Sequence, residues 1–251
     1  MFLLNMFRST GLTFLVVFQF LFLNFSVAQI KNEISPEQLI VRNAASVYFQ
    51  SLGEQSGIYR GTEYTGYPYR LKSGHQFFES ADISNGSVYY DGVLYENVPM
   101  RLDIIKDQLV VRYVDQVSGI SLHNEKIDFF SIHNHHFIHI KDDNLNIPPG
   151  FYDHVYDGGI DVLVNRSKGT LKEVSVEGNF ITILKQKNNF FLKKEGVYYQ
   201  VESSGSVLKV LGSKQKEIQE FLKKSNIKFR KDPENAIVRM VKYYDLLTES
   251  K

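Results

Sequence analysis

The chain of 251 residues contains no cysteine and no tryptophan, and its charges nearly balance. Without cysteine it is neither a disulfide-stapled domain, nor a thiol enzyme, nor a Cys-ligated zinc module. With a formal charge of +1, the chain lacks the excess of positive charge that binding to nucleic acid or to an anionic membrane surface requires. A protein of this kind must be held together by its apolar core alone, and a chain of this length can build one.

The first 28 residues have the pattern of a secretory signal peptide. Arg8 supplies the positive charge, the apolar run Gly11–Phe25 follows, and Ser26-Val27-Ala28 places small residues where a signal peptidase requires them. The apolar run is shorter than the about 20 residues that a membrane span needs. We therefore predict cleavage after Ala28, which leaves residues 29–251 as one exported, formally neutral, β-rich domain without a transmembrane segment.

Capping residues and apolar spacing predict a helix near the N-terminus, at residues 36–52. Ser35 is a favourable N-cap, Pro36 suits the first helical position, and Gln38 completes a capping box. Apolar residues then recur at helical spacing on one face, at Ile40, Ala44, Val47 and Tyr48.

Two further helices are predicted at the C-terminal end, at residues 214–224 and 233–247. Ser213 can cap the first, and Asp232-Pro233 can start the second. Both predicted helices carry an apolar stripe, so we expect each to lie against the sheet.

Between residues 59 and 211 the apolar period changes to two, which is typical of antiparallel strands. Asp91-Gly92 predicts a type I′ hairpin, and Asp157-Gly158-Gly159 predicts a second reversal. Residues 203–206 are interpreted as a turn before a last strand, Val207–Leu211. The predicted fold class is α+β: a mainly antiparallel sheet of about ten short strands, curved or closed into a barrel, with one N-terminal and two C-terminal helices.

Histidine is the residue type most suggestive of chemistry. If residues 131–140 form one strand, His133 and His135 share a face and can place two imidazoles on one metal ion. A third ligand would have to come from elsewhere, for example from His123, His154, Asp142 or Asp153. The alternative is a solvent-facing strand that carries histidine for no chemical reason, and no cofactor is predicted.

A tyrosine-rich segment gives the second candidate site, formed by Tyr59, Tyr64, Tyr67, Tyr69 and Arg70. Exposed tyrosine rings can stack on flat apolar groups, and arginine can bind carboxylates. The alternative is that these rings are buried against the sheet with only their hydroxyls in water.

Motifs for nucleophilic or phosphate chemistry are missing. The sequence has no G-x-S-x-G elbow and no phosphate-binding glycine loop. Ser-x-x-Lys occurs twice, but Ser206 is interpreted as a turn residue and Ser213 as a helix cap. A calcium loop beginning at Asp142 lacks the required glycine and glutamate.

Several segments resemble exported β-rich proteins of Bacteroidota bacteria, to which no activity is assigned. The segments are Tyr59–Tyr64, Gly74–Phe78 and Val88–Met100, and the likeness continues through Phe151-Tyr152, the Asp157-Gly158 turn and the terminal helices. The resemblance implies a place in the periplasm or on the cell surface, and it carries no catalytic residue.

Three functions remain open from the sequence. The first is a non-catalytic binding or interaction module of the cell envelope, whose partner is an envelope protein or a small ligand and not a nucleic acid. The second is a carrier that holds an apolar ligand in a sheet cavity. The third is a metal-dependent hydrolase that uses His133 and His135. The missing catalytic motifs favour the first function over an enzyme.

Overall fold

A computed structural model describes residues 36–67, 71, 73–142, 145–174 and 180–249. Contacts between residues divide the chain after Asn43, and residues 44–251 form one compact unit. The elements occur in the order α2 (Pro36–Ser51), the 3-10 helices η2 (Gly53–Gln55) and η3 (Gly57–Tyr59), β1 (Thr62–Glu63), β2 (Ser84–Tyr90), β3 (Val93–Asp103), β4 (Gln108–Arg112), β5 (Gly119–Ser121), the 3-10 helix η4 (Asn124–Lys126), β6 (Ile127–Ile132), β7 (His135–Ile140), β8 (Gly150–Tyr156), β9 (Asp161–Val174), β10 (Phe180–Lys194), β11 (Val197–Val201), α3 (Ser204–Leu211), α4 (Gln215–Lys224) and α5 (Pro233–Glu249).

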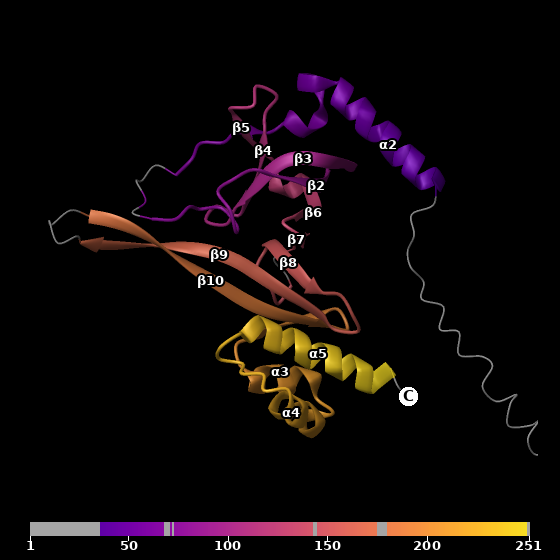
Figure 1. The fold of residues 1–251 in the computed structure, drawn as a ribbon, viewed down its shortest axis with the longest axis vertical. Helices are drawn as coiled ribbons and strands as arrows, with labels where there is room; N and C mark the ends of the chain where they lie inside the picture. Colours follow the sequence, from indigo (N-terminus) through magenta and orange to yellow (C-terminus); the bar gives the residue numbers. More distant parts are fainter. Residues whose placement is uncertain (1–35, 68–70, 72, 143–144, 175–179, 250–251) are drawn as a thin grey trace, which may run out of the picture. The chain divides into compact units, whose positions relative to one another are not determined.

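Within the described residues, eleven strands form one sheet in the order β1-β5-β4-β3-β2-β6-β7-β8-β9-β10-β11 (Figure 1). All of its strand ladders are antiparallel. β1 and β11 are the two edges and do not pair with each other, so the sheet is open and not a closed barrel. The α+β class with a mainly antiparallel sheet is therefore confirmed.

Both predicted reversals are present. Asp91 and Gly92 join β2 to β3 with φ angles of +52° and +81°, as a type I′ turn requires. Asp157 to Gly159 connect β8 to β9. The first of these turns follows directly from local chemistry, because Asp and Gly tolerate the left-handed backbone that Asp91 and Gly92 adopt.

The C-terminal helices cover the β9–β11 part of the sheet (Figure 1). The predicted stripe of α5 is fully buried at Ile237, Met240 and Val241, and Ile218 of α4 joins the same apolar cluster. The stripe of α2 behaves differently, because Val47 remains 66% exposed. Amphipathic spacing thus identified both C-terminal helices and their inner faces, but not the environment of α2.

The prediction of a last strand at Val207–Leu211 is wrong, because this segment is helix α3 and the strands end at Val201. A capping box starts the helix: the Ser203 side chain accepts the N–H of Ser206, and the Ser206 side chain accepts the N–H of Ser203. Ser206 is therefore a helix residue and not part of a turn. The capped turn lets the apolar residues of α3 pack against β10 and β11.

The predicted caps of the last two helices have different outcomes. Asp232 caps α5 as predicted, and its carboxylate accepts the backbone N–H of Asn235 at 3.2 Å. Ser213 does not cap α4, because that helix begins after Lys214, which has a left-handed backbone (φ +63°) and makes no side-chain cap.

In the part of the chain that the structure describes, no helix is both long and apolar enough to cross a membrane. The predicted signal peptide, its cleavage site after Ala28 and the predicted N-cap Ser35 lie outside the described residues.

Candidate functional site

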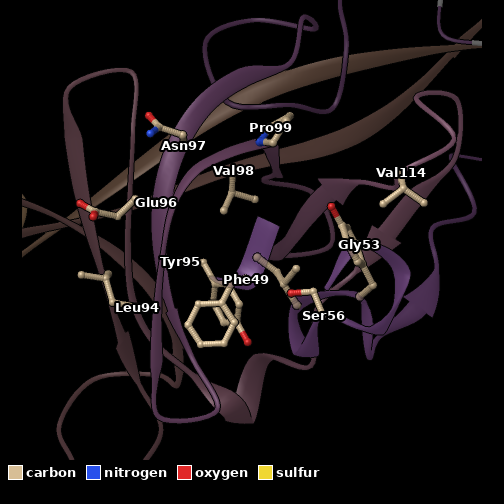
Figure 2. A pocket seen from close by; sticks show the side chains of 12 residues that line it. Phe49, Gly53, Ser56, Leu94, Tyr95, Glu96, Asn97, Val98, Pro99 and Val114 are labelled. Atoms are coloured by element: carbon tan, nitrogen blue, oxygen red, sulfur yellow. The ribbon is translucent and has the colours of Figure 1, made fainter. Parts of the chain in front are cut away.

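A pocket of about 200 Å³ lies beside strand β3, next to η2 and η3 (Figure 2). Its lining includes the carboxylate residue Glu96 and eight apolar residues, which are Phe49, Ile58, Tyr59, Leu94, Tyr95, Val98, Pro99 and Val114. The rings of Phe49 and Tyr95 pack with their centroids 4.9 Å apart. The pocket therefore presents aromatic rings and branched aliphatic groups to a ligand, with the polar residues Ser56 and Asn97 also in its lining.

A β-bulge in β3 brings two of these side chains to the same face of the sheet. In a regular strand, residues three positions apart point to opposite faces. Here Glu96 and Asn97 together oppose one residue of β2, and Asn97 takes a left-handed backbone (φ +55°) that asparagine tolerates. Tyr95 and Val98 therefore lie on one side of the strand, and Glu96 and Asn97 point away from them (Figure 2).

The strand segment that lines the pocket has a neighbouring strand on one side. β4 pairs with Met100–Asp103 of β3, so among the described residues no strand flanks Leu94–Pro99 on the β4 side. Pro99 has no N–H to donate, which suits such an edge position. An extended peptide can add its backbone to an open strand edge of this kind.

The predicted tyrosine site is divided in the structure. Tyr59 lines the pocket and packs edge-on against Tyr113, with ring centroids 5.2 Å apart. Burial raises the pKa of Tyr59, and the nearby Tyr113 adds to this shift. Tyr67 is half-buried, and Tyr69 and Arg70 lie outside the described residues.

Tyr64 belongs to a different cluster. Its hydroxyl donates to Asp103 at 2.7 Å and accepts from the amide of Gln76 at 3.1 Å. Burial raises the pKa of Tyr64 to about 12. This tyrosine thus links the segment that contains Gln76 to the end of β3, and its hydroxyl is bonded to the buried Asp103 and not left in water.

The histidine run folds into a hairpin, so residues 131–140 do not form the single strand that the metal hypothesis assumed. β6 ends at Ile132, and His133 and Asn134 form the turn with φ angles of +51° and +63°. His133 and His135 both lie near the ring of Phe78, with ring centroids 6.4 and 5.0 Å from its centroid.

His135 is held between two carboxylates. Its Nδ1 lies 2.7 Å from Asp153 Oδ2, and its Nε2 lies 3.2 Å from Glu79 Oε1. The hydrogen bond to Asp153 raises the pKa of His135, which favours the imidazolium form. Because both ring nitrogens already face carboxylates, metal binding by His135 would have to break one of these contacts.

Asp153 also binds a buried guanidinium. Arg166 donates to the same carboxylate oxygen through Nε at 3.0 Å and through Nη2. Its other contacts are with Glu234 of α5, at 2.6 and 3.0 Å. Asp153 is 1% exposed and Arg166 is 8% exposed, so this network ties α5 to the sheet in a water-excluded position.

The four residues considered as a third metal ligand lie in different places in the structure. Asp153 is the one that contacts His135, Asp142 is exposed, and His123 lies 3.8 Å from Glu125. His154 groups instead with two aspartates at the β8–β9 turn.

Sequence reasoning missed the bulge at Asn97, although the spacing of Tyr95 and Val98 breaks the strand alternation and is a signal for it. It also missed Phe49 as a pocket residue, because nothing local relates α2 to β3.

Comparisons with protein-family models, with curated proteins and with solved structures find no match to this chain. The geometry of its own side chains therefore carries the functional argument.

Proposed function

We propose that this protein is an exported, non-catalytic binding module of the bacterial cell envelope, and that the pocket beside β3 receives an aromatic side chain of a protein or peptide ligand. The observation that carries the proposal is an aromatic pocket beside Leu94–Pro99, a segment of β3 that β4 does not pair with. Tyr59 and Tyr95 would supply ring contacts, and the β3 backbone would supply hydrogen bonds to an extended segment.

The size of the pocket favours a single side chain over a whole lipid or cofactor. Pockets for drug-sized molecules measure about 300–1,000 Å³, and this one measures about 200 Å³. One ring or branched side chain matches that space, whereas an acyl chain would extend well beyond it. The carrier function is therefore less well supported.

The hydrolase that uses His133 and His135 is also less well supported. The ring nitrogens of His135 face Asp153 and Glu79, and Asp153 is bound to Arg166. These contacts are those of an ion-pair network that joins distant segments.

Export is part of the proposal and is supported by the sequence of residues 1–28. The protein recovered from a cell envelope should have the intact mass of a chain that begins at Gln29. A mass that retains residues 1–28 would contradict this part of the proposal without affecting the pocket.

The pocket can be tested by saturation-transfer NMR with N-acetyl-tryptophanamide as the probe. The chain contains no tryptophan, so indole signals report on the probe alone. One buried aromatic side chain contributes about 3 kcal/mol at most, so we expect a dissociation constant of the order of a few millimolar. Saturation should reach the indole protons of the probe in the presence of the wild-type protein.

Matched variants assign the signal to the pocket. Tyr59→Ala should abolish the transfer, and Tyr59→Phe should retain it because the ring remains. Tyr89→Ala is the control, because Tyr89 is a half-buried tyrosine that stacks on Phe129 away from the pocket lining. The proposal fails if the wild-type protein transfers no saturation, or if Tyr59→Ala transfers as much as the wild-type protein.

A further inference from the structure

A second group of polar side chains lies on the opposite face of the sheet from the pocket. Phe137 of β7 pairs with Asp153 of β8, and both are buried on the core side. Side chains alternate along a strand, so their neighbours His136 and His154 point to the other face. The Phe137–Asp153 pair is the last of this ladder, and His136 and His154 come next after it on their two strands.

The turn after β8 brings two carboxylates to His154. Asp161 begins β9, and its Oδ1 lies 3.4 Å from the Nε2 of His154. Asp157 lies in the turn itself, and one ligand atom from each of His154, Asp157 and Asp161 lies within 4.8 Å of the other two. The connection between β8 and β9 is four residues long, Asp157 to Ile160, and it keeps both aspartates near His154 in the sequence.

His154 has an unusual environment for an imidazole nitrogen. Its Nε2 is shielded from solvent and has no hydrogen-bond partner among the described residues. The contact with Asp161 is an ion pair only when the ring is protonated. Buried polar atoms nearly always have a partner, and a metal ion bound beside Asp161 would supply one for this nitrogen.

One donor pair already has the separation found in a tetrahedral zinc site. Donor atoms at about 2.0–2.1 Å in a tetrahedral site lie about 3.3 Å from one another, and the His154–Asp161 separation is 3.4 Å. Asp157 is exposed and can close the remaining distance by side-chain rotation. His136 is also exposed, and its Nδ1 contacts Ser131 Oγ at 3.0 Å, which leaves Nε2 as its metal-binding nitrogen.

We propose that His154, Asp157 and Asp161 bind one Zn²⁺ ion, and that His136, which is not one of this group of three, turns its Nε2 toward the ion as a fourth ligand. Two imidazoles and two carboxylates form a donor set that suits zinc, whereas calcium and magnesium prefer oxygen alone. The Nζ of Lys193 lies 3.6 Å from Asp161 Oδ2 and competes with the metal for that carboxylate. Lys193 is exposed enough to move away, and Zn²⁺ binding then costs this one ion pair.

Isothermal titration of the processed protein with ZnCl₂ alone tests the proposal. We expect one equivalent with a micromolar or tighter dissociation constant, and weaker binding of CaCl₂. Asp161→Asn and His154→Ala should each raise the dissociation constant for Zn²⁺ at least tenfold, and Lys193→Met should lower it. His123→Ala is the matched control, because His123 also lies near a carboxylate, that of Glu125.

Visible absorption of the Co²⁺-loaded protein gives an independent signature of tetrahedral N/O coordination. Asp161→Asn should remove this signature while the far-UV circular dichroism of the protein stays unchanged. The proposal is overturned if the wild-type protein binds no Zn²⁺, if it binds Ca²⁺ more tightly, or if His123→Ala weakens binding as much as His154→Ala. Neither the pocket nor its NMR test involves these residues, so the two proposals can fail separately.

Discussion

Replacement of Asp153 by asparagine should lower the free energy of unfolding by about 3 kcal/mol. Asp153 is 1% exposed and accepts hydrogen bonds from Arg166 and His135. Removing one partner of a buried ion pair costs about 3–5 kcal/mol, because the other charge stays buried without full compensation. The lower end of that range applies here, since Glu234 still contacts Arg166 twice and asparagine keeps one acceptor oxygen.

Urea-induced unfolding followed by circular dichroism measures this loss. For a protein of this size each kcal/mol corresponds to about 2–4 °C in Tm, so Asp153→Asn should lower Tm by about 6–12 °C. The control is Asp128→Asn, which breaks the exposed ion pair between Asp128 and Lys141. Exposed pairs contribute about 0–1 kcal/mol. If Asp153→Asn cost no more than this control, the reasoning about the buried network would be refuted.

Three further predictions concern pH and backbone conformation. The pKa of His135 is raised above 6.5, mainly by its hydrogen bond to Asp153, so its stabilising effect should be complete below about pH 6.5 and be lost as pH rises through the folded-state value. The difference in unfolding free energy between wild type and His135→Gln should therefore shrink from pH 6 to pH 8.5, and a difference that grows would contradict the assignment. Burial raises the pKa of Asp107 from 3.8 to about 6. Because the folded state then binds the proton more tightly than the unfolded state, the free energy of unfolding of the wild-type protein should fall relative to that of Asp107→Asn as pH rises from 4 to 7. Urea titrations of both proteins at pH 4 and at pH 7 measure this difference. Gly92→Ala should cost about 1–2 kcal/mol because its φ is +81°, whereas Gly66→Ala, with no positive φ and no atom within 4 Å of the added Cβ, should be near neutral in the same titration.

Local chemistry determined much of the secondary structure. The Asp91-Gly92 turn and the start of α5 after Asp232 were predictable because each depends on a few consecutive residues. The apolar period of two likewise predicted a sheet of about ten strands, and the structure contains eleven. In each case the signal and the structure that it specifies lie within one short segment of chain.

Short apolar runs were ambiguous where two periods fit. Val207–Leu211 contains two valines and suits a strand, yet the capping box at Ser203 and packing against β10 and β11 make it helical. The histidine run has no glycine to mark its turn, so the left-handed backbone at His133 and Asn134 was not predictable from composition. The pairing of β6 with β7 places the turn at these two residues.

The sequence by itself therefore determined the fold class, the Asp91-Gly92 and Asp157–Gly159 reversals, and the inner faces of the C-terminal helices. Only the tertiary structure decided which functional groups meet. The pocket joins Phe49 to Tyr95 across 46 positions of the sequence, and Arg166 reaches Glu234 across 68. The one-residue alternation of a strand sends His135 into the ion-pair network and His136 to the opposite face. Register sets that choice, and register depends on the pairing of whole strands, which no local pattern around the histidines specifies.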